Sequence, residues 1–267
     1  MRRWVRVFLF FLIIPLAVLA VFPHIIRCQF IGYAPDFQRI APGVYVSRDT
    51  PPRQRAFLLF EIRQAERRLA SLWQSPRRGR AAVIFCQTPE QYERYCRGSE
   101  GAGCSLGTPW GDAWIVINPY GRNPDVLAHE MCHDELYQRL GWLTSQRQIP
   151  QWFNEGLALM LDHRFTTARD SLQRFRDYHD EWQYLTRGQQ FVLELEEMES
   201  MRDFFGGGPQ HVMLAYMTAG REVARWLSIV GRPGLQQLTD AVAAGNDFGT
   251  TYQTLEAKAR QRAKKLR

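Results

Sequence analysis

The stretch "LAHEMCHDE", residues 127–135, sets two histidines four positions apart with a glutamate directly after the first. On an α-helix four residues advance about 400°, so His129 and His133 lie one turn apart on nearly the same face, and both imidazoles can reach one ion. Glu130 lies about 100° further round the helix, where it cannot join them as a ligand but can contact a water bound to that ion. The pattern also arises by chance in a chain with 6 His, so its interpretation depends on the surrounding sequence.

A candidate third ligand follows in the stretch "QWFNEGLALML", residues 151–161. A catalytic zinc site has three protein ligands and one open position, so two histidines are not enough. Glu155 lies 22 residues after His133 in a predicted helix, after a turn that can fold this helix back against the first. A glutamate on an otherwise apolar helix face is costly to bury unpaired, and a metal ion removes that cost. The two stretches together predict a metal site formed by His129, His133 and Glu155.

The two stretches, HEMCH and the later WFNEGLA, resemble those of the gluzincin zinc metallopeptidases, the thermolysin-like group and especially its peptidase MA-like branch. The similar region extends from the predicted strand at Trp114 to the predicted helix near Trp226. The resemblance implies a zinc metallopeptidase that hydrolyses the bonds of a peptide or protein substrate with a metal-activated water. It implies one Zn²⁺ ion and Glu130 as the general base. The implied zinc ligands are His129, His133 and Glu155.

The resemblance also implies a second donor for the oxyanion that forms during peptide hydrolysis. In the family a tyrosine or histidine from the helical half has this role. Tyr216, within "HVMLAYMTAGREVARWL" at residues 211–227, is most similar to that position, and His211 is the reserve candidate. A tyrosine in an apolar helix is also explained as a core residue with a satisfied hydroxyl.

One position departs from the family pattern. Many gluzincins have an aspartate four residues after the glutamate ligand, where it orients a motif histidine, and this chain has Leu159 there. Asp162, seven residues after Glu155 and so on the same helix face, is one candidate for that task, and Asp134 is another. The departure keeps a second interpretation open, in which the protein is a catalytically inactive, membrane-tethered scaffold or chaperone of the zincin fold.

Hydrophobic periodicity predicts an α+β fold. The resemblance makes its first part a zincin-like catalytic domain with a small mixed sheet and a zinc-binding helix, followed by a mainly helical subdomain. An apolar run at 81–86 predicts a strand, and a second strand, at 113–118, resembles the edge strand on which gluzincins bind substrate by strand addition. The predicted domains are an α+β subdomain at 28–141, a helical subdomain with the third zinc ligand at 142–255, and a basic tail at 256–267.

The N-terminus has three arginines before an apolar run that extends from Val7 to Ile26. About 20 apolar residues are enough to cross the hydrocarbon core of a bilayer, so residues 1–27 are predicted to be a membrane anchor. A secretory signal cleaved near Ala20 is the competing interpretation. The excess of arginines before the span predicts a cytoplasmic N-terminus and a periplasmic or extracellular catalytic domain.

The formal net charge of +7 is unevenly distributed along the chain. Residues 1–30 carry +4 and residues 256–267 carry +5, so residues 31–255 sum to −2. The central domain therefore lacks the basic balance that nucleic-acid binding requires, and no nucleic-acid partner is expected.

The chain has five cysteines, an odd number. Cys86, Cys96 and Cys104 are close enough in sequence to supply one disulfide in an exported domain, and the sequence leaves its pairing open.

Overall fold

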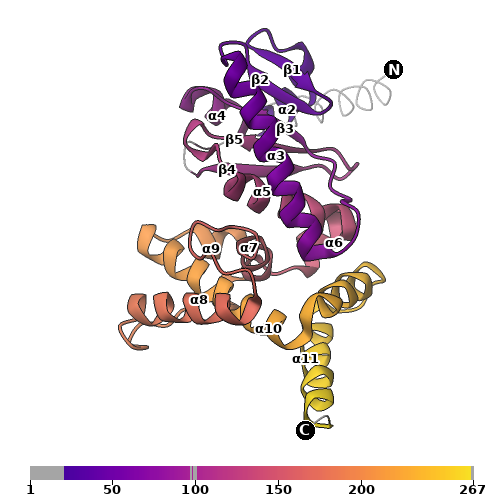
Figure 1. Ribbon diagram of the computed structural model, residues 1–267, viewed down its shortest axis with the longest axis vertical. Helices are drawn as coiled ribbons and strands as arrows, with labels where there is room; N and C mark the ends of the chain where they lie inside the picture. The colour runs from indigo at the N-terminus through magenta and orange to yellow at the C-terminus, as the bar shows by residue number, and fades with distance from the viewer. Residues whose placement is uncertain (1–20, 97, 99–100, 266–267) are drawn as a thin grey trace, which may run out of the picture. The chain divides into compact units, whose positions relative to one another are not determined.

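The computed structural model describes residues 21–96, 98 and 101–265 (Figure 1). It shows an α+β protein with one small mixed sheet and a larger number of helices, which confirms the predicted class. Contacts within the chain divide it into two compact units. The first unit consists of the residues up to Phe57 together with Ala82–Leu106 and Trp114–Arg122. The second consists of Leu58–Ala81, Gly107–Ala113 and the residues from Asn123 onward.

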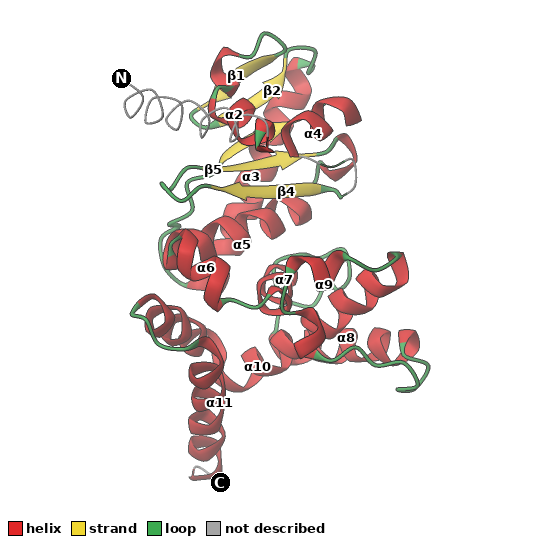
Figure 2. Ribbon diagram, turned by 180° about the vertical axis from the view of Figure 1, so that it is seen from behind, coloured by secondary structure: helices red, strands yellow, loops and turns green. Residues whose placement is uncertain are grey.

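The first unit contains a five-stranded sheet with the strand order β1-β2-β3-β5-β4 (Figure 2). Strands β1 and β2 pair antiparallel, whereas β2 with β3 and β3 with β5 pair parallel. The strands are β1 (Phe37–Ala41), β2 (Val44–Ser47), β3 (Ala82–Phe85), β4 (Gly103–Gly107) and β5 (Ala113–Ile117).

The predicted edge strand at 113–118 is an interior strand, which corrects the prediction. Strand β5 has β3 on one side and β4 on the other, so β4 forms that edge of the sheet. All five residues of β5 are buried, as expected for a continuous apolar strand inside a sheet. Every residue of β4 is partly exposed, and its sequence GCSLG has no large apolar residue except leucine.

Two helices of the first unit, α2 (Pro23–Gln29) and α4 (Pro89–Cys96), pack against each other. The thiol of Cys28 in α2 donates a hydrogen bond to the carbonyl oxygen of Tyr95 in α4 at 3.5 Å. A disulfide with an S–S distance of 2.03 Å joins Cys96, at the end of α4, to Cys104 in β4. Cys86 is a buried free thiol, and burial raises its pKa to about 12.

The membrane anchor is the second prediction that the structure corrects. Part of the expected span, residues 7–20, lies outside the described residues. Its last residues belong to α2, a seven-residue helix that begins at Pro23 and has His24 buried within the first unit. Among residues 21–96, 98 and 101–265, no helix is long and apolar enough to cross a membrane. These findings contradict the predicted transmembrane anchor and the membrane-anchored location.

The second unit is helical, and α10 is its central element. Helix α10 packs against α5, α7, α8 and α11, and it runs along α8 (Figure 1). The long helices are α3 (Pro52–Trp73), which starts in the first unit, α5 (Pro124–Leu140), α8 (Ser171–Leu185), α10 (Pro209–Ala243) and α11 (Phe248–Lys265). The short helices of this unit are α6 (Trp142–Gln148), α7 (Gln151–Leu159), α9 (Met201–Phe205) and the 3₁₀ turn η3 (Leu195–Met198). The 3₁₀ turns η1 (Ile31–Tyr33) and η2 (Pro119–Gly121) belong to the first unit.

Helix α5 is fixed at both ends by residues next to it in the sequence. The side chain of Asn123 accepts hydrogen bonds from the backbone N–H groups of Asp125 and Val126 at 3.0 and 2.9 Å, and proline occupies the first helical position. Gly141 ends the helix with a φ of 79°, a conformation that favours glycine. Both ends of the helix that carries HEMCH are therefore fixed by local interactions.

Helix α7 approaches α10 closely because residue 156 is a glycine. A Cβ atom at Gly156 would lie 2.5 Å from the carbonyl oxygen of Ala219 and 2.6 Å from a methyl group of Val223, both in α10. The glycine of the WFNEG stretch thus allows close helix packing directly beside Glu155.

Candidate metal centre

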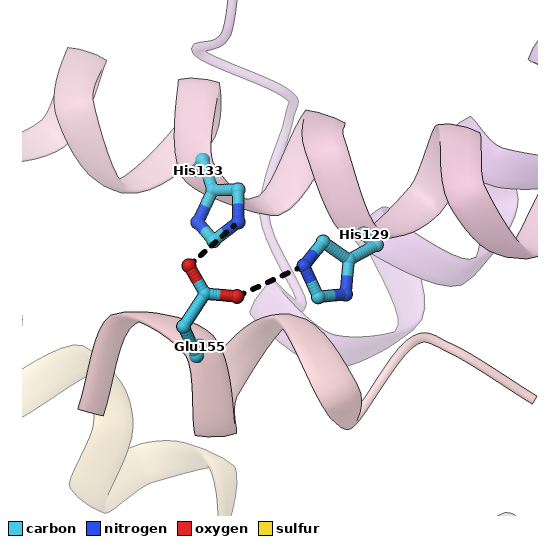
Figure 3. Close-up of side chains that lie close together, drawn as sticks. All are labelled: His129, His133 and Glu155. Atoms are coloured by element: carbon cyan, nitrogen blue, oxygen red, sulfur yellow. Dashed lines mark hydrogen bonds and ion pairs between the residues drawn. The ribbon is translucent and has the colours of Figure 1, made fainter. Parts of the chain in front are cut away.

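Helices α5 and α7 bring His129, His133 and Glu155 together inside the second unit (Figure 3). The Nε2 atom of His129 is 3.2 Å from Oε2 of Glu155, and Nε2 of His133 is 3.7 Å from Oε1. One ligand atom from each of the three residues lies within 4.8 Å of the other two. His129 and Glu155 are buried and His133 is half-buried, so a metal ion here would be largely enclosed by protein.

Polar partners lie behind the imidazole rings of the two histidines, one at hydrogen-bond distance and one as an ion-pair contact. The Nδ1 atom of His133 is 2.9 Å from Oδ1 of Asn154, and Nδ1 of His129 is 3.5 Å from Oδ2 of Asp162. Because both partners are acceptors, the Nδ1 atoms carry the hydrogens in the neutral imidazoles, and each Nε2 lone pair is free to bind a metal.

The glutamate has its own support. Gln151 donates from Nε2 to Oε1 of Glu155 at 2.7 Å. The backbone N–H of Gln151 in turn donates to the carbonyl oxygen of Glu199 at 2.8 Å, which fixes the first turn of α7. The donor set of two imidazole nitrogens and a carboxylate oxygen, each held from behind, fits a divalent transition-metal ion.

The electrostatics of the site favour a positive charge. Burial lowers the pKa of His129, but its hydrogen bonds with Asp162 and Glu155 outweigh burial and raise that pKa to about 10. Burial raises the pKa of Glu155, but the charges of His133 and His129 lower it by more. The pKa of Asp162 is likewise lowered, against burial, by His129 and Arg164. These carboxylates hold a proton on His129 when no metal is present, and a metal ion can supply the same positive charge.

The predicted base and oxyanion donor are also in the second unit. Glu130 is buried and directly follows His129 in α5. The ring of Tyr216, in α10, lies 6.4 Å from the ring of His129, centroid to centroid. Burial raises the pKa of Tyr216 well above its ordinary value, and the charges of Glu155 and Glu130 act in the same direction. His211, the reserve candidate, makes a 2.9 Å hydrogen bond through Nε2 with the backbone oxygen of Asp203.

Of the two aspartates considered for orienting a motif histidine, Asp162 is the one that faces a histidine. Asp134 instead accepts a hydrogen bond from the backbone N–H of Ala81 at 2.9 Å and lies 3.6 Å from Arg77. Asp134 therefore attaches α5 to the segment after α3. Leu159 is fully buried, and its carbonyl oxygen accepts a hydrogen bond from Arg174 at 2.8 Å.

Two residues beside the candidate metal centre were not predicted from the sequence. Arg164 forms a two-pronged ion pair with Asp162, through Nε at 3.0 Å and Nη2 at 2.5 Å. Its pKa is lowered by burial and raised by more through Asp162, with smaller contributions from Tyr216 and Glu130. An arginine just after a helix looks like an ordinary surface charge, so only the fold reveals this position. Asn154, next to Glu155, gave only the weak signal of a polar residue in an apolar stretch.

Fold and site together define an α+β protein with a buried two-histidine, one-carboxylate group that can hold a metal ion. No family model matches the chain, and no curated protein sequence does.

Proposed function

We propose that this protein is a zinc-dependent metallopeptidase of gluzincin type that acts on peptide or protein substrates. The observation that carries the proposal is the convergence of His129, His133 and Glu155, with an acceptor behind each histidine. Two histidines and a glutamate form the ligand set of a class of catalytic zinc sites that leave one position open for water. The presence of Glu130 directly after the first histidine supports catalysis, because metal binding alone does not need a base at that position.

Zn²⁺ bound by these three residues would lower the pKa of a water molecule towards about 7 and polarise the carbonyl of the scissile bond. Glu130 then accepts the proton of the attacking water and delivers it to the leaving amine. Tyr216 supplies a hydroxyl donor to the oxyanion, and burial keeps that hydroxyl protonated. Asp162 and Asn154 keep the two imidazoles oriented throughout.

The alternative is a zinc-binding scaffold of the same fold without turnover. The inactive scaffold was suggested by Leu159, which stands where many gluzincins have an aspartate that orients a motif histidine. In this structure Asp162 faces that histidine instead, at 3.5 Å. The departure at Leu159 therefore gives the inactive scaffold little support.

The test compares zinc content and peptide cleavage of the purified full chain with those of Glu130→Gln and His133→Ala. We expect about one zinc per chain in the unchanged protein and in Glu130→Gln, with cleavage in that variant at least about 100-fold slower because the base is lost. His133→Ala should lose both zinc and cleavage. Glu181→Gln, an exposed glutamate in α8, is the matched control and should change neither.

Two outcomes would contradict the proposal. Equal cleavage by the unchanged protein and Glu130→Gln would show that the activity comes from elsewhere. A zinc-loaded protein that fails to cleave a broad library of unfolded peptides would favour the scaffold.

A further inference from the structure

A cavity of about 300 Å³ lies within the second unit, among residues of α7, η3, α10 and α11. Three of its wall residues are aromatic: Trp152, Phe248 and Tyr252. All three are buried, and the ring centroids of Trp152 and Tyr252 are 5.7 Å apart, while those of Phe248 and Tyr252 are 5.5 Å apart. The ring of Tyr252 stacks on Trp226, with the centroids 4.5 Å apart, and on Phe248, so the aromatic cluster gives the cavity a rigid wall of apolar contact area.

Four glutamates line the same cavity, and two of them are already neutralised. Arg225 pairs with Glu222 at 2.7 Å and with Glu256 at 2.7 Å. Arg260, outside the cavity, also pairs with Glu256 at 2.7 Å. Two guanidinium groups thus balance these two carboxylates.

The other two glutamates, Glu196 and Glu199, lie at the exposed margin of the cavity. Within the part of the chain that the structure describes, neither side chain forms an ion pair. The cavity therefore combines an aromatic wall with two negative charges that have no positive partner. Such a site attracts a cation that carries an apolar stem and repels anions.

We propose that this cavity binds an alkylammonium or guanidinium group, of the kind that lysine and arginine side chains carry. The alkyl stem contacts the rings of Trp152 and Tyr252, and the charged head lies between the carboxylates of Glu196 and Glu199. A volume of about 300 Å³ is at the small end of ligand pockets, which suits one extended side chain. The site is separate from the three metal ligands and needs no catalytic activity to be tested.

The experiment is an NMR titration of the full chain that follows the indole N–H signal of Trp152. The probes are N-acetyl-lysine amide, N-acetyl-norleucine amide, which has the same stem without the ammonium group, and n-butylamine. We expect the lysine probe to bind at least about fivefold more tightly than the norleucine probe. The double variant Glu196→Gln/Glu199→Gln should bind the lysine probe roughly three- to tenfold more weakly, whereas the matched double variant Glu93→Gln/Glu181→Gln should bind it as the unchanged protein does.

Either of two results would overturn the proposal: equal binding of the lysine and norleucine probes, or equal weakening by the two double variants. The n-butylamine arm identifies the source of the cation. Tighter binding of the lysine probe than of n-butylamine assigns the site to peptide side chains, and the reverse order assigns it to small free amines.

Discussion

Replacing Asp162 by asparagine tests whether this carboxylate supports metal binding at the candidate site formed by His129, His133 and Glu155. Its Oδ2 atom lies 3.5 Å from Nδ1 of His129, and its side chain is buried. Asparagine keeps the size of the side chain but removes its negative charge, so Nδ1–H of His129 loses a charged acceptor and Nε2 becomes a weaker metal ligand. Loss of such a partner typically weakens metal binding by about 10- to 100-fold. That loss corresponds to about 1.4 to 2.7 kcal/mol of binding free energy.

The assay is competition for Zn²⁺ between the protein and a fluorescent chelator, at a temperature where circular dichroism shows every variant to be folded. Asp134→Asn is the matched control, because Asp134 is an equally buried aspartate on the motif helix that holds the backbone of Ala81. We expect Asp134→Asn to lower the unfolding temperature and to leave zinc affinity within about twofold of the unchanged protein. Unchanged zinc affinity in Asp162→Asn, or equal weakening in both variants, would refute the role assigned to Asp162.

Three further predictions concern pH, packing and catalysis. The pKa of His129 is raised from 6.5 to about 10 in the metal-free protein, so the contribution of this residue to stability is complete below pH 6.5 and is lost as pH rises through about 10. The unfolding temperature of the chelator-treated protein should therefore decrease as pH is raised from 7 to 10, and an unfolding temperature that does not change over this range would contradict the prediction. Gly156→Ala places a Cβ atom 2.5 Å from the carbonyl oxygen of Ala219 and should destabilise the protein by about 1 to 3 kcal/mol in urea unfolding. Gly249→Ala is the control, because a Cβ atom there meets only the side chain of Asp247, at an ordinary contact distance of 3.6 Å, and it should stabilise the protein by about 0.5 to 1 kcal/mol. Equal effects of the two substitutions would contradict the close packing. Tyr216→Phe should lower kcat at least about tenfold in the peptide assay with zinc content unchanged, and an unchanged kcat would remove Tyr216 from the site.

Local signals predicted the motif helix and the start of its partner helix correctly, but the partner helix ends at Leu159, so Asp162 lies beyond it and not on the predicted helix face. Asn123 and Gly141 determine where α5 begins and ends, and the four-residue spacing of the histidines depends only on helix geometry. The candidate role of Glu155 as a metal ligand was also predicted from the sequence, because a lone carboxylate in an apolar helix needs a compensating partner. These features depend on short stretches of chain.

Features that depend on distant parts of the chain could not be predicted from the sequence. The place of β5 inside the sheet follows from its pairing with β3 and its neighbour β4, and neither pairing leaves a signal in β5 itself. The apolar run before Ile26 looked continuous, but Pro23 begins a separate short helix whose partner, α4, lies more than 60 residues further along the chain. Side-chain partners such as Arg164 depend on how the chain turns after α7.

Leu159 and Asp162, three residues apart, lie in different surroundings at the end of helix α7. Helix α7 ends at Leu159, and the buried side chain of this residue packs closely against Gly220 in α10. Its carbonyl oxygen accepts a hydrogen bond from Arg174. An aspartate at that position would place a charge in the apolar contact between α7 and α10, at a cost that only a charged partner could offset. Three residues later the chain has left the helix, and Asp162 faces both His129 and the guanidinium of Arg164. The apolar residue thus serves helix packing, and the later aspartate faces His129, one of the three candidate metal ligands, so the proposed metallopeptidase does not need an aspartate at position 159 to orient that histidine.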